Sequence, residues 1–291
     1  MGKLGQNRVG TKMEIEEGWE IVEKEISKLI NLLEGVPDES PRYDLIYSAI
    51  YNMCQGKLVD DNNPYDAYKE LYTRYKGVYN KYLNSKVLPS ILNKHDDDDV
   101  FMLQELVKRW ATHKVMVTKL VRYFNYMDRH YTSLIGLPSL KDVGFDCFRK
   151  IVYEKMKVNV KDVVIALVNI EREGNEIDWR LVKDVVDIFV EIGNGKLDCY
   201  VNDLETAVLT DLVDYYTGKG FDEITPIECL QMEKDRVSHY LHPSSKEKLF
   251  PKEAQVLPER TEHGHRKKIR FSQWVHEKNM LLSQQGHDKI M

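Results

Sequence analysis

The sequence predicts an all-α protein, an elongated stack of about two multi-helix units of the α-solenoid kind. Hydrophobic residues make up 42% and charged residues 31% of the chain, a balance that suits amphipathic helices with one buried and one solvated face. Glycine occurs 16 times and proline 9 times in 291 residues, few enough to leave long stretches without a helix breaker. Apolar residues recur at three- and four-residue spacings in two successive sets of helices, which can bury these faces against one another.

The first unit is predicted over residues 13–137, after a polar, glycine-containing leader at residues 1–12 that we expect to be disordered. A helix is predicted over residues 13–33, because apolar side chains recur there with the helical period. Gly35, which is followed by valine and proline, interrupts this pattern. The first helix is therefore expected to end before this glycine.

The second predicted helix has a start signal and carries a stripe of aromatic side chains. Ser40 can cap a helix, and Pro41 is favoured in a first turn. Over residues 43–54, tyrosine and isoleucine recur at helical spacing and so share one face. That face carries Tyr43, Ile46, Tyr47, Ile50 and Tyr51.

Further helical stretches complete the first unit. Residues 67–92 form a long aromatic stretch that we expect to be interrupted near Pro89. The acidic run at residues 96–99 is expected to cap the next helix, over residues 100–120. The apolar pattern then continues until Gly136, which is followed by leucine and proline and stops it.

The second unit is predicted over residues 138–250, and its clearest feature is an αα-hairpin at residues 163–193. The first helix of the hairpin is nearly all apolar and ends in a polar turn at Gly174. Asp178 can cap the second helix, whose apolar residues recur at three- and four-residue spacings until Gly193. Both helices can therefore bury one face.

Two more helices are predicted at residues 204–216 and 227–240, separated by the sequence Gly-Lys-Gly that begins at Gly218. The helical pattern decays beyond them. We interpret residues 251–291 as a divergent, loosely ordered tail with a basic cluster at residues 266–270. Such a short cluster is weak evidence for a nuclear localisation signal.

Composition argues against several classes of partner and compartment. The four cysteines are widely spaced, and none forms a CxxC pair, which favours reduced thiols over a disulfide framework or a zinc site. No stretch approaches the ~20 apolar residues needed to cross a bilayer. The net charge is −5, with basic and acidic residues intermixed. We therefore expect a cytoplasmic and/or nuclear protein that binds neither nucleic acid nor membrane.

No motif indicates catalysis, a cofactor or a metal. His239 and His242 lie three residues apart, but no third ligand follows at a recognisable distance. The acidic run at residues 96–99 lacks the alternating ligands and the glycine of a calcium loop. Glu171 and Glu173 are interpreted as polar turn residues before Gly174. The sequence thus predicts no catalytic residue, no cofactor and no metal ligand, and a protein that is not an enzyme.

Four segments, in this order along the chain, resemble the cullin family, the elongated scaffolds of multisubunit ubiquitin ligases. They are RYDLIYSAIYNMC from Arg42, YMDRHY from Tyr126, the αα-hairpin, and MEKDRVSHYLHPSS from Met232. The resemblance covers roughly residues 13–250 and is strongest to plant members of the cullin-1 branch. It implies that the two units are the N-terminal helical repeats of that family.

The resemblance also implies a docking face for a Skp-type adaptor, which carries an F-box substrate receptor. In the family this face is formed by the second and fifth helices of the first repeat. The second helix would contribute the stripe from Tyr43 to Tyr51, and the fifth would add Phe124, Asp128 and Tyr131, which can share a face. Tyrosine suits such a surface because it buries a large ring while keeping a hydrogen bond at the wet edge. Alternatively, the same rings fill the core of the repeat.

We therefore expect a non-catalytic cullin-like scaffold of SCF-type E3 ubiquitin ligases, acting in protein ubiquitination and degradation. Cullins continue into a C-terminal region that binds the RING-box protein and accepts a ubiquitin-like modifier, and we expect the chain to be truncated before it. Such a chain could compete for the adaptor. The alternative is a helical remnant of a cullin gene that has lost partner binding, or a helical interaction module with an unrelated partner.

Overall fold

The computed structural model describes residues 13–56, 66–218 and 226–249, and within these ranges the chain is helical apart from short turns, with no strand. The all-α class predicted from the sequence is thus confirmed. The chain divides into two compact units, Met1–Lys155 and Met156–Met291, here called unit 1 and unit 2. The leader at residues 1–12, the segment at 219–225 and the tail at 251–291 lie outside the described residues.

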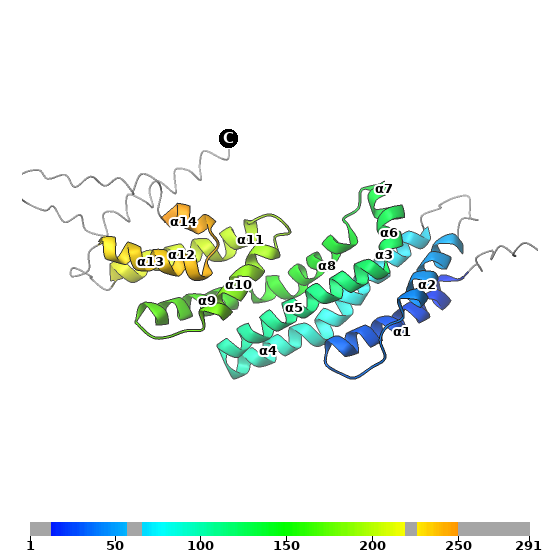
Figure 1. The fold of residues 1–291 in the computed structure, drawn as a ribbon, viewed down its shortest axis with the longest axis horizontal. Coiled ribbons are helices and arrows are strands. Elements are labelled where there is room, and N and C mark those ends of the chain that lie inside the picture. The colour runs from blue at the N-terminus through cyan, green and yellow to red at the C-terminus, as the bar shows by residue number, and fades with distance from the viewer. Residues whose placement is uncertain (1–12, 57–65, 219–225, 250–291) are drawn as a thin grey trace, which may run out of the picture. The chain divides into compact units, whose positions relative to one another are not determined.

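Unit 1 is built of helices that pack side by side (Figure 1). Its α-helices are α1 (Ile15–Leu33), α2 (Tyr43–Gly56), α3 (Asp66–Tyr82), α4 (Leu88–Asp97), α5 (Asp99–Tyr123), α6 (Asn125–Met127), α7 (Ser133–Ile135) and α8 (Leu140–Phe148). Three π-helical segments, η1 (Leu83–Val87), η2 (Asp128–Thr132) and η3 (Arg149–Tyr153), connect some of them without a break. Helix α1 packs on α2, α4 packs on α5, and α8 packs on both α3 and α5.

Hydrogen bonds in the core of unit 1 attach α8 to α3. The Tyr75 hydroxyl donates to the carbonyl oxygen of Leu140 over 2.9 Å and lies 2.9 Å from the Tyr79 hydroxyl, and both tyrosines are fully buried. A methyl group on Gly144 would lie only 2.7 Å from a methyl carbon of Val117 on α5. Glycine therefore permits the close approach of α8 to α5. The division between the expected repeats at residue 137 stays a prediction, and α8 belongs to compact unit 1.

Most of the predicted helix ends occur where local signals placed them. Gly35, Gly136 and Gly174 all have positive φ angles, of 75°, 69° and 88°, which suit glycine after the end of a helix. The Asp98 carboxylate accepts a hydrogen bond from the Val100 amide over 2.6 Å, and Asp178 accepts from the amides at the start of α10. These caps and stops are confirmed.

The predicted start of the second helix is wrong by two residues, because a contact from another helix determines it. Helix α2 begins at Tyr43, and the Ile46 amide bonds to the Arg42 carbonyl. The Arg42 amide donates to the Glu25 carboxylate on α1 over 2.7 Å, and Glu25 is only 3% exposed. Ser40 and its neighbouring proline therefore lie in the connection before the helix.

The interruption expected near Pro89 occurs earlier, in η1. The chain stays helical from α3 through Leu83–Val87 into α4, and Pro89 lies in the first turn of α4. Proline has no amide hydrogen to bond to the preceding turn of this continuous helix, and its ring would clash with the carbonyl four residues earlier in a regular α-helix. The π-helical turn absorbs the irregularity before the proline.

Unit 2 contains the predicted αα-hairpin, formed by α9 (Glu154–Arg172), whose first two residues belong to unit 1, and α10 (Trp179–Glu191). It continues with α11 (Asp198–Tyr200), the π-helical segment η4 (Val201–Glu205), α12 (Thr206–Gly218), α13 (Pro226–Tyr240) and α14 (Ser244–Leu249). Helix α10 buries Leu181, Val182, Val185, Val186, Ile188 and Phe189, which confirms the predicted apolar face. The hairpin is therefore a packing element.

A buried histidine makes unit 1 sensitive to acid. His113 on α5 is fully buried, and its Nε2 lies 2.9 Å from the Gly144 carbonyl oxygen, which can only accept, so Nε2 carries the proton. Its Nδ1 has no hydrogen-bond partner among the described residues. Burial lowers the pKa of His113 from 6.5 to about 4.

We predict that the free energy of unfolding falls as the pH drops from 6.5 to about 4. In this range the unfolded chain binds a proton at His113 and the folded chain does not, so acid favours unfolding, by up to about 3 kcal/mol. Urea unfolding at several pH values measures the effect. His113→Phe should flatten this dependence, and the exposed His130→Gln should leave it unchanged. An unaltered profile for His113→Phe would contradict the assignment.

Candidate partner-binding surface

The stripe predicted on α2 divides between the core and the surface. Ile46 and Ile50 are fully buried, whereas Tyr43 and Tyr51 are 37% and 39% exposed and Tyr47 is half-buried. The two isoleucines therefore cannot contact a partner directly from these positions, which corrects the expectation for them. The physical reason is that α2 packs against α1 and α5, and this contact takes the most apolar side chains of the stripe.

The residues expected from the fifth helix lie mainly in the core as well. Phe124 is fully buried with its ring centroid 5.0 Å from that of Tyr75, and Tyr131 is 4% exposed and stacks on Tyr68 at 5.4 Å. The half-buried Asp128 accepts hydrogen bonds from the Leu140 amide over 3.0 Å and from a threonine hydroxyl. For Phe124 and Tyr131 the structure thus agrees with the core alternative. All three residues support the surface from beneath.

Tyr126 on α6 is a surface residue that the sequence analysis missed. Its ring lies 5.2 Å from that of Tyr51, edge to face, and 4.4 Å from that of His130. The Gln55 side chain of α2 donates a hydrogen bond to the Tyr126 hydroxyl over 3.0 Å. Tyr126 lies in the segment YMDRHY and four residues before His130, a helical spacing that could have drawn attention to it. It connects α2 to α6.

At the other end of α2, Tyr43 is held by three neighbours. Its ring centroid lies 5.9 Å from those of Tyr47 and Tyr123, and the guanidinium carbon of Arg122 lies 5.1 Å above it. Arg122 is exposed, so this cation–π contact holds a cation over the face of the Tyr43 ring. We call Tyr43, Tyr47, Tyr51 and Tyr126, with Arg122 and His130 beside them, the tyrosine surface.

The thiol and hydroxyl groups of Cys54, Tyr68 and Tyr131 beneath the tyrosine surface are neutral. Burial raises the pKa of the Cys54 thiol to about 12, and burial also raises the pKa values of the Tyr68 and Tyr131 hydroxyls. A protonated thiol is a poor nucleophile.

In the part of the chain that the structure describes, no group of three or more His, Cys, Asp or Glu side chains could hold a metal. No helix in this part is long and apolar enough to span a membrane.

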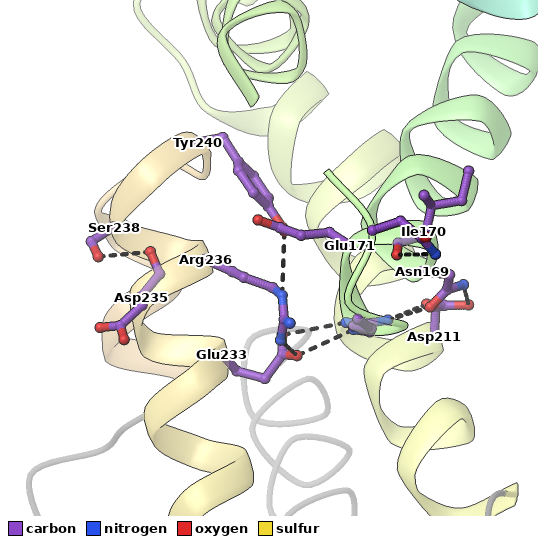
Figure 2. A network of polar contacts seen from close by, with 11 residues as sticks. Asn169, Ile170, Glu171, Asp211, Glu233, Asp235, Arg236, Ser238 and Tyr240 are labelled. Carbon is purple, nitrogen blue, oxygen red and sulfur yellow. Dashed lines mark hydrogen bonds and ion pairs between the residues drawn. The ribbon is translucent and has the colours of Figure 1, made fainter. Parts of the chain in front are cut away.

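A buried polar network in unit 2 connects α9 to α12 and α13 (Figure 2). The Arg172 side chain is 1% exposed and contacts Asp211 over 2.6 Å and Glu233 over 3.2 Å. Arg236 bridges Glu233 at 2.7 Å and Glu171 at 3.3 Å. The interpretation of Glu171 as a polar turn residue is therefore wrong, because the last turn of α9 lies against α13. The network holds α13 in place.

The two histidines considered as ligands make other contacts. The His242 Nδ1 lies 2.9 Å from the Ser244 hydroxyl, at the start of α14. The His239 ring lies 6.1 Å from that of Trp179. Both sets of contacts are of the kind found in packing and in helix capping.

The chain matches a known family of α-solenoids. Residues 19–284 match the family model described as the Cullin alpha solenoid domain, which assigns the stacked helices to the α-solenoid class. The chain belongs to the cullin family. The resemblance recognised in the sequence is thereby confirmed, and the matched residues continue beyond residue 250, where we placed its end.

Relatives from plants agree with this assignment. The chain is 46% identical to Cullin-1 of Oryza sativa subsp. japonica over an alignment of 253 positions, with 82% of this chain and 33% of that protein covered. It is 42% identical to Putative cullin-like protein 2 of Arabidopsis thaliana, with 83% of this chain and 66% of that protein covered. It is 37% identical to Cullin-like protein 3 of Arabidopsis thaliana, with 82% and 94% covered. The chain thus spans about a third of rice Cullin-1.

We predict that Arg172→Ala destabilises unit 2 strongly, because Asp211 and Glu233 would both lose the most deeply buried cation of the network. Glu233 would keep its contact with Arg236. Removing one partner of a buried ion pair costs about 3 to 5 kcal/mol. Hydrogen exchange of the α9 and α13 amides measures the loss. The matched control is Lys183→Ala, which removes an exposed pair with Asp187 and should cost less than about 1 kcal/mol. Equal effects of the two variants would contradict the role of the network.

Proposed function

We propose that this chain is a non-catalytic, cullin-type scaffold of SCF-type E3 ubiquitin ligases and that unit 1 binds a Skp-type adaptor that carries an F-box protein. The observation on which the proposal rests is the tyrosine surface, which lies on the second helix of unit 1 and on the segment after its fifth helix. Membership of the cullin family supports the role of a scaffold in ubiquitination. We place this role in the cytoplasm and/or nucleus, and the free cysteines Cys54, Cys147 and Cys199 are consistent with it.

The geometry of the tyrosines favours partner binding. Aromatic side chains at the centre of an interface contribute much of its binding energy, and tyrosine is enriched among such residues. Here each ring is already held by a neighbour, as Tyr43 is by Arg122 and Tyr51 is by Tyr126. A partner would therefore order few side chains on binding, which lowers the entropic cost. Partial exposure also leaves the rings accessible without unfolding.

A helical module with an unrelated partner, or one that has lost partner binding, is the second candidate. The burial of Ile46, Ile50, Phe124 and Tyr131 favours it to some extent, because these residues were expected on the docking face. Substitution of the exposed tyrosines is the test that distinguishes the two candidates. Only the first requires that changes in these side chains weaken binding to the adaptor.

We predict submicromolar binding of the full chain to a purified Skp-type adaptor in complex with an F-box protein. Tyr47→Ala combined with Tyr51→Ala should weaken the affinity about 30- to 700-fold, since each truncation of an interface tyrosine costs about 1 to 2 kcal/mol. Isothermal titration calorimetry measures both affinities.

The control is Phe101→Ala. Phe101 is an exposed aromatic residue in the first turn of α5, and the tyrosine surface adjoins the last turn of this helix. Helix α5 has 25 residues, so its ends lie about 35 Å apart. This variant should bind like the unaltered chain. A folded chain that does not bind the adaptor, or a double tyrosine variant with unchanged affinity, would reject the first candidate.

A further inference from the structure

An exposed apolar pair lies at the end of the segment that carries Tyr126. Leu134 on α7 is 67% exposed, the highest fraction for a large apolar side chain among the described residues, and its neighbour Ile135 is 43% exposed. Single exposed apolar residues are common on protein surfaces. The position of this pair relative to the tyrosine surface distinguishes it from scattered ones.

A continuous helix leads from the tyrosine surface to Leu134. Helix α6 passes into η2 and η2 into α7, and the junction residues Asp128 and Ser133 keep right-handed helical angles. Tyr126, His130 and Leu134 follow one another at four-residue intervals along this segment, a spacing that keeps them near one side of it, and we call these three residues the strip. The rings of Tyr126 and His130 touch at 4.4 Å along it. The strip therefore begins at the tyrosine surface and ends at Leu134.

The end of the strip is held rigidly. Gly136 has a φ of 69°, and the Leu137 amide bonds to the Thr132 carbonyl over 3.0 Å, which closes the helix. The Ser133 hydroxyl donates to the Asp128 carbonyl, and the Asp128 carboxylate accepts from the Leu140 amide. Leu134 thus projects from a fixed turn, and binding there would cost little backbone entropy.

The charges beside the strip favour an acidic partner. Arg122 and Arg129 are both exposed, one at each side of Tyr126 along the chain. The Asp128 carboxylate is half-buried and is already bonded to the Leu140 amide and to a threonine hydroxyl. Burial, and then the nearby negative charge of Asp66 on α3, raise the pKa of the Tyr131 hydroxyl beneath the surface. Arg122 lies at the Tyr43 end of the tyrosine surface, and Arg129 precedes His130 in the segment that leads to the apolar pair, so a docked surface would meet an exposed guanidinium group at both places.

We propose that Leu134 and Ile135 form a second contact of the docking face and insert into an apolar pocket with an acidic rim, on the same partner that covers the tyrosine surface. This inference rests on the proposed function. It extends the interface along α6, η2 and α7, beyond the second helix. The guanidinium groups of Arg122 and Arg129 steer the acidic partner and fix its register.

The test uses the full chain and the adaptor in complex with an F-box protein. Leu134→Ser combined with Ile135→Ser should weaken the affinity about tenfold to thirtyfold, mainly through faster dissociation. Arg129→Glu should slow association about tenfold at low salt, and the difference should shrink as salt is raised. Surface plasmon resonance measures both rates. Circular dichroism should stay unchanged, because the substituted side chains are exposed.

The outcomes separate this inference from the function on which it rests. The control Leu92→Ser changes a 42% exposed side chain on α4 and should leave binding unaltered. If the double tyrosine variant loses affinity while the Leu134 and Ile135 variant keeps it, the second contact is rejected and the proposed function stands. If the unaltered chain does not bind the adaptor, both are rejected.

Discussion

The tyrosine surface depends on the burial of the apolar residues that alternate with it. On α2, Ile46 and Ile50 enter the core completely, and their burial turns the tyrosines of the same helix toward the outside. After the end of α5, the burial of Phe124 and Tyr131 likewise turns Tyr126 toward the outside. The buried residues thus determine which side chains of the same helices are exposed and available to a partner. A change in core packing would rotate α2 or α6 and move the whole surface.

Buried polar groups give both units specific helix contacts. Glu25 bonds to the amide that precedes α2, and the Tyr75 hydroxyl bonds to a carbonyl of α8. In unit 2, Arg172 and Glu233 connect α9 to α13. Apolar contact alone would allow such helices to slide or rotate, whereas a buried donor must meet one acceptor or lose its hydrogen bond. These pairs therefore determine the register of each helix on its neighbour.

Sequence reasoning succeeded where a feature depends on a few neighbouring residues. The positive φ of Gly136 and the capping by Asp178 are properties of local turns, and both were predicted. It failed where the decisive contact is distant. A stripe of apolar residues on α2 does not reveal that Ile50 is buried and Tyr51 exposed, since the packing of other helices decides this. The burial of Arg172 likewise depends on Glu233, 61 residues further along the chain.

The proposed interface lies within one compact unit. The tyrosine surface and the apolar pair come from α2, the end of α5, α6 and α7, all in unit 1, and the groups that position them, such as Tyr75 and Asp128, are in the same unit. Coupling to unit 2 is therefore not needed to assemble the surface. In a scaffold, this separation lets one unit present a docking face of fixed geometry while the stability of the other depends on its own network around Arg172. The proposed docking surface and the stability of unit 2 thus rest on different sets of contacts.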